Sequence, residues 1–173
     1  MPDQQHLQAQ ADVFGGVFIL VQYLSRLTDA ALRDWGLTTR QWLLLAVLNK
    51  AYPDHAPSLT EAAEVYGSSR QNVKQIALGL EARGFLHLVP DPGDGRTTLI
   101  ERTGKERMFD EPDGQARAAA LLAQAFDGLS RADTLALQSI VGRWVGGLAE
   151  EWRVAERRDA RAGPARDQPA AER

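Results

Sequence analysis

Apolar residues recur every three or four positions through the first part of the chain. Between Asp12 and Trp35 they occupy Val13, Val17, Leu20, Leu24, Leu27 and Ala31. This spacing predicts a helix with one apolar face. Asp12 suits its N-cap, and Gly36 suits the position just after its last residue.

A second helix is expected to begin at Thr38. Thr38 and Gln41 have the spacing of a capping box, in which each side chain bonds a free amide of the other residue. The residues that follow, Trp42 to Leu48, are almost all apolar. Such a helix is expected to lie buried in the middle of the domain.

Two further helices are predicted on either side of a tight turn. Ser58 and Glu61 form a second capping box before a short helix that stops at Gly67. Ser68-Ser69-Arg70-Gln71 forms a third, before a helix that runs to Gly84. Two helices joined at a glycine are typical of a helix-turn-helix.

The pattern then changes from helical to alternating. Residues 85–89 and 97–102 are short and rich in β-forming residues, and residues 90–96, PDPGDGR, are a strong turn signal. This predicts a β-hairpin directly after the helix-turn-helix, which is called a wing. The expected fold class is therefore mainly α with a small β-hairpin wing.

Helical patterns return after the hairpin. Pro112-Asp113-Gly114 interrupts the chain, and an alanine-rich helix is expected over Gln115–Leu129. Ser130 suits the cap of a last helix, whose apolar stripe is Leu137, Val141, Trp144, Leu148 and Trp152. Beyond Arg153 the chain is charged and rich in Ala and Pro, so we expect a disordered tail.

Composition excludes several classes of function. The chain has 173 residues, 44% hydrophobic and 25% charged, as in an ordinary soluble domain. It contains no cysteine, so disulfides, zinc–thiolate sites and thiol-based redox sensing are excluded. We see no signal peptide, and the longest apolar stretch, residues 17–23, is too short to span a bilayer. We therefore expect a cytoplasmic protein with no membrane association.

The sequence shows none of the motifs or residue spacings that would indicate an enzyme. His6, His55 and His87 are scattered and lack metal-ligand spacing. There is no nucleophile elbow, phosphate-binding loop or GxGxxG motif. We expect no catalytic residues, no metal and no cofactor.

Charge is distributed unevenly along the chain. The formal net charge is −3, but the stretch from Ser68 to Arg107 holds seven basic and five acidic residues. A locally basic middle in an acidic body fits a nucleic-acid footprint, although an excess this small is weak evidence alone.

The order of elements resembles the MarR family (multiple antibiotic resistance regulators) of winged-helix transcription factors, from about Asp12 to Trp152. The segments that carry the resemblance are Leu37-Thr38, Ser58–Ala63, Ser68–Gly84 with its exit to Leu86, and the wing Asp91–Arg96. Asp94-Gly95-Arg96 matches the family's Asp-x-Arg pattern in the wing.

The chain departs from this family in three places. Arg102-Thr103-Gly104-Lys105-Glu106 stands where the family usually has Leu-Thr-x-Lys-Gly. Pro112 to Gly114 breaks the family's long fifth helix, and the wing has one basic residue near its tip where many members have two.

The resemblance implies a division of the chain by role. Residues 1–35 would be an N-terminal dimerisation helix, and residues 36–107 the winged helix-turn-helix DNA-binding domain. Residues 108–153 would be C-terminal dimerisation helices, followed by the tail at 154–173. The expected partners are a second copy of the chain and double-stranded DNA with a palindromic operator.

The polar residues near the start of the second helix of the pair are the candidates for DNA contact, because a helix-turn-helix places that region in the major groove. They are Ser68, Ser69, Arg70, Gln71, Asn72, Lys74 and Gln75. Arg70 could contact guanine, Gln71 or Asn72 adenine, and Lys74 phosphate. Arg96 resembles the family arginine that enters the minor groove. The alternative is a helix face that only meets solvent.

Aromatic residues on the first two helices are candidates for an effector pocket, since the family often binds aromatic ligands nearby. They are Phe18, Tyr23, Trp35 and Trp42. The alternative is that they belong to the core. The sequence identifies no ligand.

Taken together, the sequence predicts a dimeric, sequence-specific DNA-binding regulator, most often a repressor in this family, modulated by a small effector. The alternative is a dimer with the same fold that acts through protein contacts and binds DNA weakly or without specificity. The low net charge, the sparse wing and the altered junction leave this alternative open.

Overall fold

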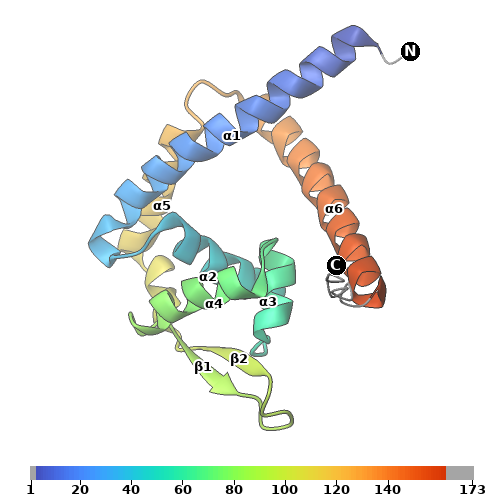
Figure 1. The fold of residues 1–173 in the computed structure, drawn as a ribbon. Helices are drawn as coiled ribbons and strands as arrows, with labels where there is room; N and C mark the ends of the chain where they lie inside the picture. Colours follow the sequence, from blue (N-terminus) through green and yellow to red (C-terminus); the bar gives the residue numbers. More distant parts are fainter. Residues whose placement is uncertain (1–2, 163–173) are drawn as a thin grey trace, which may run out of the picture. The chain divides into compact units, whose positions relative to one another are not determined.

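We describe residues 3–162 of the chain in a computed structural model. They fall into two compact units, one that ends at Gly128 and one that begins at Leu129. In order along the chain, the first unit contains α1 (Gln4–Leu32), η1 (Arg33–Trp35), α2 (Thr39–Ala51), α3 (Leu59–Tyr66), α4 (Arg70–Glu81), β1 (Leu86–Pro90), β2 (Thr98–Arg102), η2 (Lys105–Phe109) and α5 (Pro112–Ala125) (Figure 1). The second contains α6 (Arg131–Ala162).

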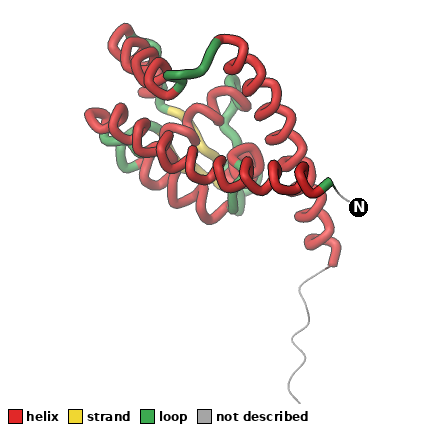
Figure 2. The backbone as a smooth tube through the Cα atoms, turned by 90° about the horizontal axis from the view of Figure 1, so that it is seen from above, coloured by secondary structure: helices red, strands yellow, loops and turns green. Residues whose placement is uncertain are grey.

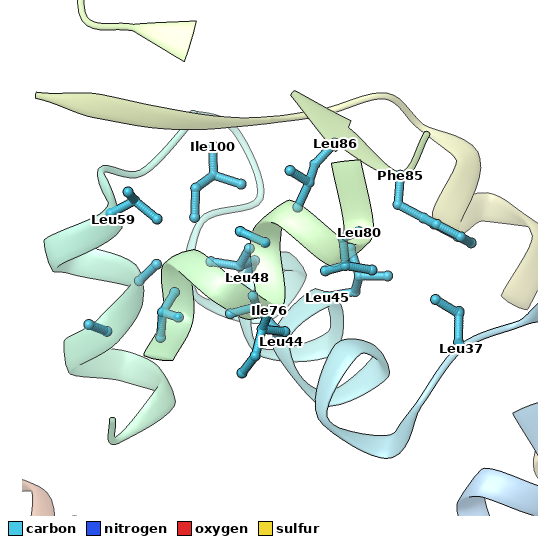
Figure 3. Close-up of a cluster of buried hydrophobic side chains, with 14 of the residues drawn as sticks. Leu37, Leu44, Leu45, Leu48, Leu59, Ile76, Leu80, Phe85, Leu86 and Ile100 are labelled. Carbon is cyan, nitrogen blue, oxygen red and sulfur yellow. The ribbon is translucent and has the colours of Figure 1, made fainter. Parts of the chain in front are cut away.

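The core of the first unit gathers around α4. This helix packs against α2, α3 and β1, and it buries Val73, Ile76, Ala77 and Leu80. Figure 3 shows leucines of α2 and Leu59 of α3 meeting these side chains, with Phe85, Leu86 and Ile100 from the hairpin beside them. The buried helix predicted from Thr38 is confirmed, because α2 buries Leu44, Leu45 and Leu48.

The two strands form one antiparallel hairpin. Leu86 pairs with Arg102 and Pro90 with Thr98, and residues 91–97 connect the strands. Figure 2 shows this hairpin as the only strand structure among the helices of the described residues. The predicted wing is confirmed, with each strand starting one residue later than expected.

The first helix is longer than predicted. It begins at Gln4, because Asp3 rather than Asp12 is the N-cap and accepts the Gln5 N–H at 3.1 Å. Asp12 lies within the helix and accepts a hydrogen bond from the Gln8 amide. At the other end a 3₁₀ turn follows the helix, and Gly36, with φ of 65°, ends that turn as expected.

The end of α1 is fixed to the start of α2. The Asp29 carboxylate accepts bonds of 2.7 Å from both the Thr39 N–H and the Thr39 hydroxyl, whose single proton is shared with the Ser25 carbonyl oxygen at 3.0 Å. Farther towards the N-terminus α1 exposes many large apolar residues: Leu7, Val13, Phe14, Phe18, Ile19, Leu20, Val21 and Tyr23. By length and mean hydropathy alone, the segment Gln4–Trp35 could also cross a membrane.

α5 begins at Pro112, earlier than the predicted Gln115, and ends at Ala125, before the predicted Leu129. The prediction placed Pro112 to Gly114 outside the helix, but Pro112 is the first residue of α5, where its missing N–H costs nothing. Gly114 is buried in the elbow between η2 and α5. Arg117 holds the elbow to η1 through Asp34, at 2.7 Å, and its guanidinium lies over the Trp35 ring.

In the second unit, α6 is a single long helix. Ser130 caps it as predicted, accepting the Asp133 N–H, while the Asp133 carboxylate accepts the Ser130 N–H. The helix continues to Ala162, whereas a disordered tail was expected from residue 154. Residues 163–173 of that expected tail lie outside the described part of the chain. The predicted stripe is exposed: Leu137, Val141, Trp144, Leu148 and Trp152.

We predict that Gly114→Ala destabilises the fold. A Cβ at this position would meet the backbone carbonyl oxygens of Met108 and Phe109 far inside contact distance, and backbone cannot give way as a flexible side chain can. The expected loss is about 1–3 kcal/mol in the free energy of unfolding, typical of overpacking. Denaturant unfolding would measure it.

Gly95→Ala in the wing is the matched control. A Cβ there has no neighbour within 4 Å, and the φ of Gly95 is not positive. Its effect is expected within about 0.5 kcal/mol of zero. Equal stabilities of the two variants would contradict this account of the elbow.

Candidate nucleic-acid interface

The turn between α3 and α4 is built from a glycine and two serines. Gly67 ends α3 with φ of 69°, a left-handed conformation that favours glycine, and the Ser68 N–H donates to the Ala63 carbonyl at 3.1 Å. The predicted cap of α4 was one residue early. Ser69 is the N-cap, and it accepts the Asn72 N–H at 3.2 Å.

Ser68 has a different part in the same turn. Its hydroxyl accepts a 2.8 Å bond from the Asn72 side chain, which is half-buried. Asn72 was predicted as a residue that could read adenine, but its amide is engaged in holding the turn. The structure therefore separates Asn72 from the freely exposed candidates.

The remaining candidates on α4 form one exposed face. Arg70, Gln71, Lys74 and Gln75 are all exposed, opposite the buried residues of the same helix. None of these four side chains has a hydrogen-bond or ion-pair partner among the described residues. Leu78, one turn further along, is also exposed at 39%, although it was not among the predicted contact residues. The sequence could have indicated this exposure, because Leu78 continues the helical spacing of Gln71 and Gln75.

The connection at the tip of the wing is held by its own acidic residues. Asp94 accepts the Arg96 N–H at 3.1 Å and the Thr97 hydroxyl, while Asp91 accepts the Gly93 N–H at 2.8 Å. Among the described residues, Asp94 and Arg96 form no ion pair with each other through their side chains. The Arg96 guanidinium is exposed and free to meet a ligand.

The wing is tied to both helices of the pair. The Ile100 N–H donates to the Pro57 carbonyl at 2.8 Å, next to a β-bridge between Leu99 and Ser58, the N-cap of α3. Near the end of α4, the Glu81 carboxylate accepts the Leu88 N–H at 2.7 Å. Hydrogen bonds therefore join the wing to both α3 and α4.

The departure from the family pattern at Arg102 has a structural role. The Arg102 guanidinium bonds the Asn49 side chain and the carbonyls of Tyr52 and Pro53, the latter two at 2.7 and 2.8 Å. These groups lie at the C-terminal end of α2, where a cation also complements the helix dipole. A leucine could not make these bonds.

The residues after Arg102 bind the exit of α4. The Thr103 hydroxyl donates to the Gly84 carbonyl at 2.9 Å, and the Lys105 ammonium donates to the Arg83 carbonyl at 2.7 Å. Lys105 also lies over the Phe85 ring, 4.6 Å from its centre. The altered junction thus fixes the base of the wing to the body of the domain.

The four aromatic residues predicted for an effector pocket are split between two environments. Phe18 and Tyr23 on α1 are 60% and 67% exposed. Trp35 and Trp42 are half-buried against the core, and Trp35 meets the edge of Phe109. A cavity of about 570 Å³ lies elsewhere, between the loop at His55 and the base of the wing near Arg107, and none of the four lines it.

The described part of the chain contains no candidate metal site. Among these residues, no group of three or more His, Asp or Glu could hold a metal ion. The residues brought together instead are an exposed polar helix face and an arginine-bearing hairpin. This arrangement defines a winged helix-turn-helix, a class of DNA-binding domain.

Comparison with known proteins agrees with this class. Residues 35–97 match the model of the MarR family. Transcriptional activatory protein BadR of Rhodopseudomonas palustris is 26% identical over 118 residues, which cover 68% of this chain and 67% of BadR. Residues 35–97 are therefore similar to the MarR family of DNA-binding transcriptional regulators.

Solved structures share the fold. BpsR of Bordetella bronchiseptica, whose DNA binding is regulated by 6-hydroxynicotinic acid, aligns with a TM-score of 0.66 at 22% identity, over 78% of this chain and 98% of BpsR. A mutant of MarR from E. coli in complex with operator DNA aligns with a TM-score of 0.62 at 17% identity, over 73% of this chain and 89% of that one.

We predict an acid-dependent contribution of Glu61 to stability. The Ser58 N–H, which donates to Glu61 at 2.7 Å, and the Ser58 hydroxyl lower the pKa of this carboxyl below its ordinary value of 4.5. A group with a lowered pKa in the folded state stabilises it above the ordinary value and loses that contribution as pH falls through the lowered one. Glu61→Gln should therefore flatten the fall in stability below about pH 4.5.

Thermal unfolding across the acid range would measure this effect. Glu64→Gln removes the same charge from an exposed position of α3 that lacks the capping bonds, and should leave the slope closer to that of the wild type. Identical pH profiles for the wild type and Glu61→Gln would show that the capping bonds contribute nothing through ionisation.

Proposed function

We propose that two copies of the chain bind a palindromic operator, each reading one half-site with α4 in the major groove and Arg96 in the minor groove. The observation that carries this proposal is the exposed polar face of α4 beside a wing whose arginine has no intramolecular ion pair among the described residues. Inserted arginine is favoured where the minor groove is narrow and its potential most negative.

The exposed side chains suit distinct contacts. Arg70 can donate two hydrogen bonds to guanine, and Gln71 or Gln75 can exchange two with adenine. Lys74 suits phosphate, as do the free backbone N–H groups of the first turn of α4 after Ser69. Ser68 and Asn72 would act indirectly, by holding the turn that presents these groups.

Dimerisation is supported by apolar surface that each unit leaves uncovered. α1 is apolar on most sides over residues 13–24, and α6 exposes its predicted stripe. Exposed apolar area of this extent marks an interaction surface. A two-fold dimer would place two reading helices about 34–36 Å apart, one turn of DNA.

A lipid bilayer is a poorer partner for α1 than a second protein chain. The last turns of α1 pack on α2 and α5 and hold Thr39 through Ser25 and Asp29. Those residues belong to the folded unit and cannot lie in hydrocarbon. We therefore propose a cytoplasmic protein, where its DNA target also lies.

We propose that a small aromatic effector modulates DNA binding and that the bound dimer represses its targets. The regulation of BpsR by 6-hydroxynicotinic acid supports an effector of this class. BadR, in contrast, is named as a transcriptional activatory protein. Activation of the target genes by the bound dimer would contradict the repressor part of this proposal. An effector can act only through different affinities for two conformations of the dimer.

We predict that Arg70→Ala and Arg96→Ala each weaken operator binding while the protein stays dimeric. The Arg70 change should cost roughly 1–3 kcal/mol per half-site and relax base preference at one position. Arg96→Ala should weaken binding most on sites with a narrow minor groove. Fluorescence anisotropy would give affinities, and light scattering should give twice the 19.0 kDa chain mass.

Arg33→Ala is the matched control, because it removes one exposed positive charge from η1 rather than from α4 or the wing. Its affinity should stay close to that of the wild type. If Arg70→Ala and Arg96→Ala both regulate and bind as the wild type does, the alternative gains support: a dimer that acts through protein contacts.

We predict that at least one small aromatic carboxylate or phenol quenches tryptophan fluorescence and lowers operator affinity. A panel that includes 6-hydroxynicotinic acid would test this, with an allosteric effect on the order of 5–150-fold as the usual range. Trp42→Phe should remove part of the quenching if Trp42 lies at the site. A panel without any effect on operator affinity would contradict aromatic control.

A further inference from the structure

One residue on the outer face of α4 differs in chemistry from its neighbours. Gln71, Gln75 and Leu78 are spaced by four and three residues, so they follow one another along a single stripe of the helix. The buried residues lie on the opposite side. Leu78 is not part of the buried core cluster, and it stands 39% exposed on the stripe that faces outward.

Only one group on the major-groove edge of the base pairs offers an exposed leucine an apolar contact. Leucine has no hydrogen-bonding group, so it cannot read the donors and acceptors of guanine, adenine or cytosine. The C5-methyl of thymine is the apolar group that the major groove displays, and apolar side chains contact it. Burying both groups together also removes each from water.

We propose that Leu78 selects thymine by contact with its C5-methyl group. This inference rests on the proposed DNA-binding function and adds a specificity-determining residue to it. With a rise of 1.5 Å per residue, Leu78 lies about 10 Å beyond Gln71 along the helix axis.

The test uses the full-length dimer and its selected operator. Each thymine of a half-site is replaced in turn by deoxyuridine, which removes the methyl and leaves hydrogen bonding unchanged. For the wild type, one position should lose about fourfold in affinity per half-site, the factor expected for one methyl-sized group returned to water. Replacing it in both half-sites should multiply the two factors.

Leu78→Ala should bind the unmodified operator more weakly and lose its sensitivity to deoxyuridine at that position alone. Leu78→Met keeps an apolar side chain of similar reach and should keep the sensitivity. Val65→Ala is the matched control, since Val65 is exposed to a similar extent, 41%, on α3. It should show the wild-type pattern of deoxyuridine effects.

The outcomes separate this inference from the function on which it rests. If the wild type selects no sequence, the proposed function fails and this inference fails with it. If the wild type selects an operator but tolerates deoxyuridine everywhere, or if Leu78→Ala keeps the wild-type pattern, the inference alone is overturned.

Discussion

The burial of one face of α4 is the constraint on which the rest of the structure depends. Val73, Ile76, Ala77 and Leu80 are held by α2, α3 and the hairpin, and this fixes the rotation of the helix about its axis. A rotation by one residue would move every polar candidate by about 100°. The packing of the core therefore determines which side chains can meet a ligand, without any of the core residues touching it.

The sequence was most informative where local physics decides the structure. The capping boxes at Thr38 and Ser58, the turn glycines and the wing were all predicted, because each depends on residues close together along the chain. The predicted start of α1 was wrong. Asp3 and Asp12 both suit an N-cap, so local sequence does not decide between a longer and a shorter helix. α6 continues past Arg153 although its composition suggested disorder.

Long-range contacts were beyond sequence reasoning. Arg102 was seen only as a departure from a pattern, and its bonds to the end of α2 join residues about fifty positions apart. In the candidate site, exposure of Arg70, Gln71, Lys74 and Gln75 followed from periodicity. The engagement of Asn72 by Ser68 did not, because two neighbouring serines offered alternative caps and the difference is a shift of one residue.

The bond between Glu81 and the Leu88 N–H has a consequence for how the protein recognises a target. Together with the bonds of Thr103 and Lys105, it holds α4 and the wing in one fixed arrangement. The conformational entropy of aligning these two elements is therefore lost on folding and not on binding. In the proposed dimer, the spacing between α4 and the wing would be fixed within each protomer, and the distance between the two protomers would be the quantity that can change. Base recognition would then depend on each protomer alone, and control of affinity on the arrangement of the two.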